Sequence, residues 1–274
     1  MRANRLRQLL KDDQPSVGTH VHATWPTVVE VLGHTQQYDY VEFSGEYAPF
    51  DLHGLDDFCR AAELHGLGAM IKLDQQPRTW LAQRAIGAGF QAVLFADIRS
   101  ADDARECVLA TRPDTPEHGG TYGAADRRNS YWNEAATQDY LDAIADTVVI
   151  LMIEKQVAVE QLDEILAVPG VDMIQWGPSD YAMSIGRPGG WYDPDVKEVE
   201  RDVISRALAA GVVPRVEIVE PADAEPYLDL GVRHFCIGTD LHVLHAWWRE
   251  RGSALRERLG IGGPTADPGP KGPY

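Results

Sequence analysis

The sequence predicts an α/β fold in which eight parallel strands alternate with helices and close into a single (β/α)8 barrel. Eight short apolar or β-branched runs are separated by segments with apolar residues at helical spacing, such as Leu55, Phe58 and Ala62. Glycine stands just before several of these runs, as in "GAGFQAV" and "DLGVRHF", which is typical of a helix-to-strand turn. A doubly wound open sheet is the competing arrangement that the same alternation allows.

The predicted strands are short runs of apolar, β-branched and aromatic residues bounded by polar or glycine-containing segments. In chain order they are "SVGTHVH" (16–22), "YDYVEF" (38–43), "GAMIKL" (68–73), "AVLFAD" (92–97), "TVVILMI" (147–153), "MIQW" (173–176), "VPRVEI" (213–218) and "HFCIG" (234–238). Most of the intervening segments have the period of a helix that packs on one face.

Two segments depart from this alternation. Residues 110–140, which we assign to the connection after the fourth strand, are rich in Gly, Pro and polar residues. Long excursions at the carboxyl face of a barrel usually build an active site, so we expect this one there. The tail "GIGGPTADPGPKGPY" (260–274) is too rich in Gly and Pro to pack, and we expect it to be flexible or draped over a neighbour. The predicted barrel domain is residues 1–259.

Composition excludes several classes of function. The formal charge of −17 and the pI near 4.8 argue against nucleic acid or an anionic membrane as partner, because an acidic surface repels phosphate. Three widely spaced cysteines, Cys59, Cys107 and Cys236, suggest neither a disulfide framework nor a zinc cluster and favour a cytoplasmic location. No secretion signal and no membrane-spanning run is recognisable.

Two acidic residues follow neighbouring predicted strands. Glu154 ends the fifth strand in "LMIEK", and Asp180 lies just beyond the sixth in "MIQWGPSDY". Carboxyl ends of barrel strands meet at one face, so the two carboxylates should share either a proton or a cation, and an all-oxygen site suits Mg²⁺ or Mn²⁺. The structural alternative is that each carboxylate only stabilises the start of the following helix.

The stretch "MIEKQVAVEQLDEILAVPGVDMIQWGPSDYAMSIGRPG" resembles the signature of the HpcH/HpaI aldolase family, and "YDYVEFSGEYAP", "GAMIKL" and "GTDLHVL" resemble other strands of that family. The resemblance extends from about Gly18 to Leu244. It implies a barrel of the phosphoenolpyruvate/pyruvate-binding type, a divalent metal, carbon–carbon lyase chemistry through a pyruvate-like enolate, and commonly a hexamer.

The resemblance implies roles for several residues. Glu154 and Asp180 match the metal-binding carboxylates. Glu46 matches the acidic residue after the second strand. The loop whose backbone N–H groups meet the substrate carboxylate corresponds to Gly177, Pro178 and Ser179.

Four positions depart from the family pattern. Tyr47 replaces the proton-relaying histidine, Lys72 replaces the arginine that holds the keto oxygen, and Ser44 and Met152 replace an aspartate and a glutamine. Lysine retains positive charge for an enolate but loses the bidentate fork of arginine. Tyrosine donates a proton but is a poor base at an ordinary pKa.

Two histidines are candidates for the missing base. His20 and His22 alternate along the first strand and therefore share a face, which the resemblance turns toward the metal. The structural alternative is a hydrogen-bonded core histidine and a histidine at the helix interface. Glu42 points inward on the second strand, and its nearest predicted partner is Lys72.

Arg128 resembles a family arginine in the long loop, although Arg127 suits the same role and either is also explained as a solvated cation. Trp176 stands next to the metal loop, where it flanks an aromatic substrate or packs structurally.

The predicted function is a metal-dependent aldolase-type lyase, with Mg²⁺, Mn²⁺ or Co²⁺, acting on a 2-oxo or hydroxy acid. Tyr47, His20 or His22 would move protons and Lys72 would stabilise the enolate. The alternatives are a decarboxylase or another carbon–carbon bond-cleaving enzyme on an unusual, aromatic substrate, and a binding barrel without turnover. The expected assembly is a homo-oligomer, a hexamer or trimer.

Overall fold

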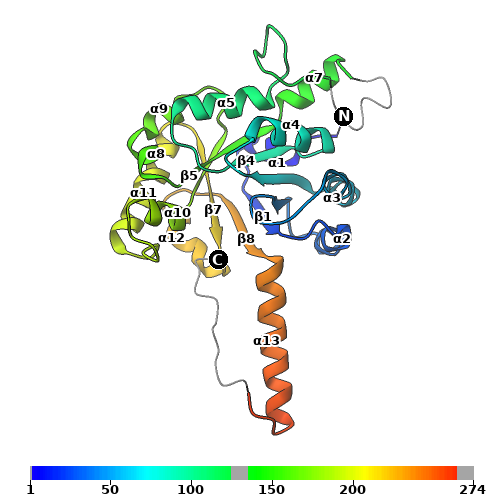
Figure 1. Cartoon of the computed structure of the whole chain (residues 1–274), viewed down its shortest axis with the longest axis vertical. Helices are drawn as coiled ribbons and strands as arrows, with labels where there is room; N and C mark the ends of the chain where they lie inside the picture. Colours follow the sequence, from blue (N-terminus) through cyan, green and yellow to red (C-terminus); the bar gives the residue numbers. More distant parts are fainter. Residues whose placement is uncertain (1, 125–134, 264–274) are drawn as a thin grey trace.

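The chain folds into a closed ring of eight parallel strands wrapped by helices (Figure 1). The structure is a computed structural model, which describes residues 2–124 and 135–263. Each strand is hydrogen-bonded to the next along the chain, and the first strand pairs with the eighth to complete the ring. The predicted (β/α)8 barrel is confirmed, and the open doubly wound sheet is wrong.

The strands lie where their sequences predict, with bounds that differ by at most two residues. They are β1 (Ser16–Val21), β2 (Tyr40–Ser44), β3 (Gly68–Leu73), β4 (Ala92–Phe95), β5 (Val148–Ile153), β6 (Met173–Trp176), β7 (Val213–Ile218) and β8 (His234–Thr239). Every residue of β2 to β6 is buried, because helices cover the outside of the ring and side chains fill the inside.

Most of the described helices lie around the outside of the ring of strands (Figure 1). The described helices are α1 (Arg5–Lys11), α2 (Pro26–His34), α3 (Leu52–Leu64), α4 (Arg78–Ala88), α5 (Ala101–Thr111), α7 (Gln138–Ala145), α8 (Gln156–Glu160), α9 (Leu162–Leu166), α10 (Pro178–Ser184), α11 (Pro194–Ala209), the 3-10 turn η1 (Pro221–Ala224), α12 (Glu225–Leu228) and α13 (Asp240–Arg258). Side-chain caps fix several helix starts: the Asp51 carboxylate accepts from Gly54 N at 2.7 Å, and Ser100 and Asp103 form a capping box. Within the described residues, no helix combines the length and apolar character needed to cross a membrane.

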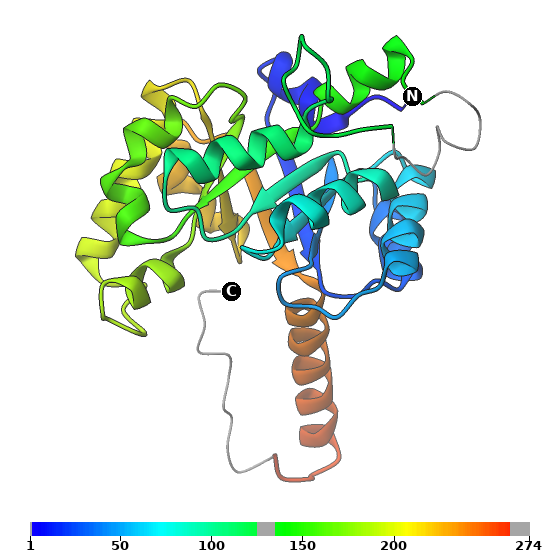
Figure 2. The same ribbon diagram turned by 45° about the horizontal axis from the view of Figure 1, so that its top comes forward.

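Helix α13 is the exception to the layered arrangement. It leaves the carboxyl end of β8 and projects away from the barrel, as Figures 1 and 2 both show. None of its residues is buried. The carboxyl end of the barrel, where α13 begins, lies at the bottom of Figure 1.

The described parts of the long excursion lie at the opposite end of the barrel. The segment begins after α5 rather than after β4, so it returns the chain to the amino end of the sheet. Arg112 donates to Thr147 O at 2.9 Å just before β5, and Tyr140 donates to Gly123 O at 2.6 Å. The expectation that this excursion lines the carboxyl face is therefore wrong for residues 112–124 and 135–137, which follow a helix and not a strand.

The interior of the ring has an apolar half and an ionic half. The apolar half consists of side chains from α1 and from β2 to β6, namely Leu6, Tyr40, Met70, Ala92, Leu94, Val148, Ile150, Met152 and Met173. The ionic half is built on β1, β2 and β7. Its centre is Arg215, which is fully buried and pairs with the equally buried Glu42. The Arg215 guanidinium also donates to Tyr40 Oη at 2.7 Å and contacts the Gln175 side-chain oxygen.

This arrangement corrects the expected partner of Glu42. Glu42 pairs with Arg215, whereas the Lys72 ammonium lies 2.8 Å from Glu46. Arg215 and Glu42 are on β7 and β2, which are not adjacent in the ring, so their long side chains meet across the interior. Tyr40 fits beneath β1 only because position 18 is glycine: a Cβ there would lie 2.3 Å from the Tyr40 ring.

The Arg215–Glu42 pair should dominate the stability of the barrel interior. We expect Glu42→Gln to lower the free energy of unfolding in urea by about 3–5 kcal/mol, because the guanidinium would remain buried without its counter-charge. The surface pair of Arg5 with Asp39, at 2.9 Å, provides the control, and Arg5→Gln should cost only about 0–1 kcal/mol. Equal losses in the two variants would contradict this account.

Candidate active site

Glu154 and Asp180 both lie at the carboxyl end of the barrel. Glu154 directly follows β5, Asp180 is in the first turn of α10, and the two strands pair up to Ile153 and Trp176. Burial, together with the negative charges of Asp180 and Glu46, raises the pKa of Glu154 to about 7, although Lys72 and the hydrogen bond from Asp97 N–H lower it. The carboxylates of Asp180 and Glu46 therefore lie close enough to Glu154, at the carboxyl end of the barrel, to affect its pKa.

Gly177 explains why the sixth strand breaks where it does. Its N–H donates to Ile153 O at 3.1 Å and holds the turn against the end of β5. A Cβ at this position would lie 2.5 Å from Glu154 Oε2 and 2.6 Å from Glu154 Cβ. Glycine is required because the Glu154 side chain packs directly over the backbone. Pro178 then begins α10 and brings Asp180 to the rim.

Two further residues, which sequence reasoning missed, complete this part of the rim. Asp97, after β4, donates its backbone N–H to Glu154 Oε1 at 2.7 Å from a left-handed conformation with φ 58°. The Lys155 ammonium lies 2.6 Å from Asp97 Oδ1 and 2.6 Å from Asp180 Oδ1. The signals in the sequence were the aspartate that ends "AVLFAD" and a lysine beside the predicted metal ligand.

The donor set fits a hard divalent cation. Glu154 and Asp180 supply carboxylate oxygens, which are the ligands that Mg²⁺ and Mn²⁺ prefer. Glu154 is 3% exposed, and a cation would compensate the desolvation that its carboxylate suffers. Lys155 supplies one positive charge to Asp180 already, so a divalent cation has to share that carboxylate with an ammonium group.

Lys72, Glu46 and Tyr47 form a second group at the mouth. The Lys72 ammonium donates to Tyr47 Oη at 2.6 Å and lies 2.8 Å from Glu46. Burial opposes the charged form of Lys72, but Tyr47, Glu154 and Glu46 outweigh it and raise the lysine pKa well above its ordinary value. Burial also raises the pKa of Tyr47, so its hydroxyl is a proton donor rather than a base at neutral pH.

His20 and His22 lie together as the alternation along β1 predicts, with ring centroids 5.9 Å apart. His20 Nδ1 is 3.5 Å from Glu217. His22 Nδ1 is 3.2 Å from Asp240, and the His22 ring centroid is 6.4 Å from that of Tyr47. Both imidazoles are therefore paired with carboxylates on the side of the mouth opposite Glu154.

The remaining predicted residues have more varied positions. Pro178 and Ser179 occupy the first turn of α10. Trp176 is 6% exposed and packs on Tyr181, with ring centroids 4.7 Å apart, in the layer between the barrel and its helices. It also lines a cavity of about 360 Å³ together with Trp191, Tyr192 and Tyr227. Arg127, Arg128 and Trp132 lie outside the described residues.

Comparison with known proteins gives a consistent result. A family profile described as HpcH/HpaI aldolase/citrate lyase matches residues 17–246. A hydroxypyruvate/pyruvate aldolase of Roseovarius nubinhibens is 33% identical over 222 residues, which are 80% of this chain and 84% of the relative. A solved HpcH/HpaI aldolase/citrate lyase family protein of Burkholderia cenocepacia has a TM-score of 0.81 at 30% identity and covers 93% of this chain and 100% of its own. An HpcH/HpaI aldolase of Desulfitobacterium hafniense has a TM-score of 0.84 at 22% identity, covering 97% and 100% of the two chains.

Lys155 should weaken the binding of a cation between Glu154 and Asp180. We expect Lys155→Met to lower the Kd for Mn²⁺, measured by electron paramagnetic resonance titration, about tenfold or more, because the ammonium no longer competes for Asp180. Lys11, which pairs with Asp146 at 2.9 Å at the other end of the barrel, provides the control variant Lys11→Met. Unchanged or weaker Mn²⁺ binding in Lys155→Met would show that the ammonium does not compete.

Proposed function

This chain belongs to the HpcH/HpaI aldolase/citrate lyase family, whose aldolases are metal-dependent lyases, and we propose that it cleaves 4-hydroxy-2-oxo acids to pyruvate and an aldehyde. The observation that carries the proposal is the convergence of Glu154, Asp180 and the charged Lys72 on one barrel mouth. Pyruvate is the proposed product because the relative from Roseovarius nubinhibens is named for hydroxypyruvate and pyruvate.

We propose Glu154 and Asp180 as the residues that hold a divalent metal, Mg²⁺ or else Mn²⁺ or Co²⁺. When bound, such a metal polarises the carboxylate and the adjacent oxygen of a 2-oxo acid. In the loop from Gly177 to Ser179, we propose that Ser179 presents its backbone N–H to the substrate carboxylate, because the Gly177 N–H is already bonded to Ile153 O and Pro178 has no N–H. The Asp97 N–H, by its hydrogen bond, keeps the Glu154 side chain in position for this role.

Lys72 is proposed to stabilise the enolate that forms when the bond between C3 and C4 breaks. Lys72 is only 6% exposed, so its positive charge is screened less than that of a surface lysine and stabilises an enolate more strongly. Glu46 and Tyr47 fix the ammonium from two directions. A lysine held by Glu46 and Tyr47 thus places a fixed point charge where an arginine would present a planar, bidentate fork.

We assign the movement of protons mainly to His20 and His22, which lie on the side of the mouth opposite Glu154. In the cleavage direction the C4 hydroxyl loses a proton and C3 of the enolate gains one, so a donor and an acceptor are both needed. Tyr47 is suited only to donation, because its pKa is raised. His20 and His22 are the proposed acceptors and donors, and each has a carboxylate neighbour.

We also propose a homo-oligomer, a hexamer or trimer, assembled through α13. Leu241, Leu244, Trp248, Leu255 and Leu259 recur at spacings that place them on one stripe of the helix, and each is between 44% and 62% exposed. An apolar stripe of this length on a helix that projects from the barrel is typical of a subunit contact. Cys59, Cys107 and Cys236 are buried and form no disulfide, which supports the proposed cytoplasmic location.

The first test combines metal binding with product release. We expect Mg²⁺, Mn²⁺ or Co²⁺ to raise the melting temperature of the wild-type protein and to support pyruvate release from 4-hydroxy-2-oxo acids in a lactate dehydrogenase-coupled assay. Lys72→Met should keep the thermal shift but lose about 100-fold in kcat, because it removes charge stabilisation from the enolate and not the metal ligands.

Glu154→Gln and Asp180→Asn should lose both the thermal shift and the pyruvate release. If no metal shifts the melting temperature, the proposed function is wrong. A thermal shift without pyruvate release from any 4-hydroxy-2-oxo acid would favour a decarboxylase or another carbon–carbon lyase.

A second test concerns the assembly. Trp248→Glu, within the apolar stripe, should reduce the molar mass measured by sedimentation equilibrium, because a buried charge opposes the contact. Ser253→Glu, on the other face of α13, is the matched control and should leave the mass unchanged. A monomeric wild-type protein at micromolar concentration would contradict the assignment of this helix.

A further inference from the structure

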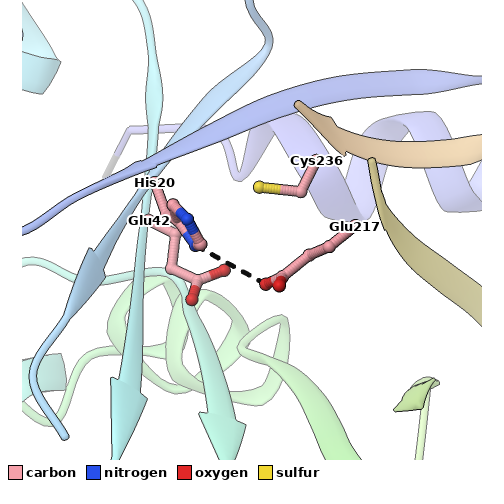
Figure 3. Close-up of side chains that lie close together, drawn as sticks. All are labelled: His20, Glu42, Glu217 and Cys236. Carbon is pink, nitrogen blue, oxygen red and sulfur yellow. Dashed lines mark ion pairs between the residues drawn. The ribbon is translucent and has the colours of Figure 1, made fainter. Parts of the chain in front are cut away.

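Four titratable side chains form a layer inside the barrel just below the mouth. This ionic layer consists of His20, Glu42, Arg215 and Glu217, from β1, β2 and β7. Figure 3 shows His20 and Glu217 facing each other across the interior, with Glu42 beside them. Glu217 also accepts from the Gln175 side chain at 2.8 Å and lies 3.8 Å from Arg215.

The layer contains two acids and two bases. Arg215 is always charged and compensates one of the two carboxylates. The second negative charge, on a group only 13% exposed, requires a further cation, because the interior solvates an unpaired charge poorly. His20 is the base placed to supply it. Burial opposes its protonation, but Glu217 and Glu42 outweigh burial and Arg215, so the pKa of His20 is raised.

His20 is also the base of the layer that reaches open space at the carboxyl end of the barrel. It lines a cavity of about 150 Å³ at the carboxyl end of the barrel together with Glu217, Thr239 and His242. The His20 ring lies next to the His22 ring, which in turn lies next to the Tyr47 ring. The Tyr47 hydroxyl accepts a hydrogen bond from Lys72. Arg215 and Glu42, in contrast, are fully buried beneath this surface.

A metal site is the competing interpretation of the same cluster. One ligand atom from each of His20, Glu42, Glu217 and Cys236 lies within 4.8 Å of the others. The Arg215 guanidinium, however, already contacts Glu42 and stands against Glu217. A permanent cation between the two carboxylates repels a metal ion and provides the compensation that the metal would bring, so a proton on His20 explains the cluster better.

We propose that His20 exchanges the proton with C3 of the substrate and that Glu217 is the positioning residue that orients its imidazole and pairs with its positive charge. This inference rests on the proposed aldolase function and adds to it the identity of the proton carrier. In the cleavage direction the C3–C4 bond breaks, the C4 hydroxyl proton passes to water in the mouth, and the imidazolium gives its proton to C3. The neutral imidazole then takes up a proton from water, which balances the cycle.

The groups that face His20 come from every element around it. They are Glu217 and Arg215 on β7, Glu42 on β2, Cys236 on β8, His22 just after β1 and His242 on α13. Among them Glu217 is the strongest source of negative charge on His20, ahead of Glu42. Removing the charge of Glu217 should therefore make the imidazolium a stronger acid.

The test is Glu217→Gln in the full-length, metal-loaded protein. Histidine labelled with ¹³C at Cε1 reports each imidazole by NMR, and the His20 signal is assigned by its loss in His20→Asn. We expect the pKa of His20 to fall by about one unit or more in Glu217→Gln. Cleavage needs the protonated imidazole, so the alkaline limb of its pH–rate profile should shift to lower pH by the same amount. Exchange of the pyruvate methyl hydrogens with D₂O needs the neutral imidazole, so the acid limb of its profile should shift to lower pH as well.

We also expect kcat for cleavage at neutral pH to fall about tenfold in Glu217→Gln, with KM changed less than threefold, because the carboxylate acts through His20. Glu200→Gln is the matched control: Glu200 is another buried glutamate, 5% exposed, whose partners are Tyr227 and Lys197. It should leave the His20 titration and both pH profiles unchanged.

Two outcomes overturn the inference alone: a His20 titration that is unchanged in Glu217→Gln, or a titration that moves while both pH profiles stay fixed. A wild-type protein that neither cleaves 4-hydroxy-2-oxo acids nor exchanges the pyruvate methyl hydrogens overturns the proposed function, and with it the catalytic role of His20. In that case the NMR titration still decides whether Glu217 and His20 form the charged pair.

Discussion

The pairing of β1 with β8 is the constraint on which the site depends. It joins residues more than 200 positions apart and leaves the ring without a free edge. Because every strand pair is parallel, all eight strands end at the same rim. Only in a closed ring do Glu154 and Asp180, which follow β5 and β6, share one mouth with His20 and His22. The candidate site is therefore a property of the whole circle rather than of the segment from 150 to 190 that carries its most recognisable motif.

Charge compensation is the second constraint. The described interior holds titratable groups on β1, β2, β3 and β7, and His20, Glu42 and Lys72 each pair with a residue from another segment. The partners differ in depth: Arg215 and Glu42 have no exposed surface, whereas Lys72 and Glu46 are 7% and 20% exposed. The fully buried Arg215–Glu42 pair stabilises the barrel, whereas the more exposed pairs at the mouth are accessible to a bound molecule.

The fold was predictable from the sequence because buried parallel strands read as continuous apolar runs, and eight such runs are recognisable. Glu154 and Asp180 were found because each follows such a run. Lys155 and Asp97 were missed because their role depends on the reach of side chains and on a left-handed backbone at Asp97. The Arg215–Glu42 pair was missed because no local pattern indicates which of several inward charges meets which across a ring.

The long excursion adds a consequence for anyone who modifies this protein. Its described residues lie at the amino rim, where the turn from Thr115 to Gly119 is closed by its own hydrogen bonds and Gly119 has φ 63°. The proposed active site is therefore at the carboxyl end of the barrel, and this turn is at the amino end. An affinity tag or a fluorescent label grafted into that turn would lie at the far end of the barrel from the proposed catalytic groups, whereas a graft of the same size after β2 would enter among them.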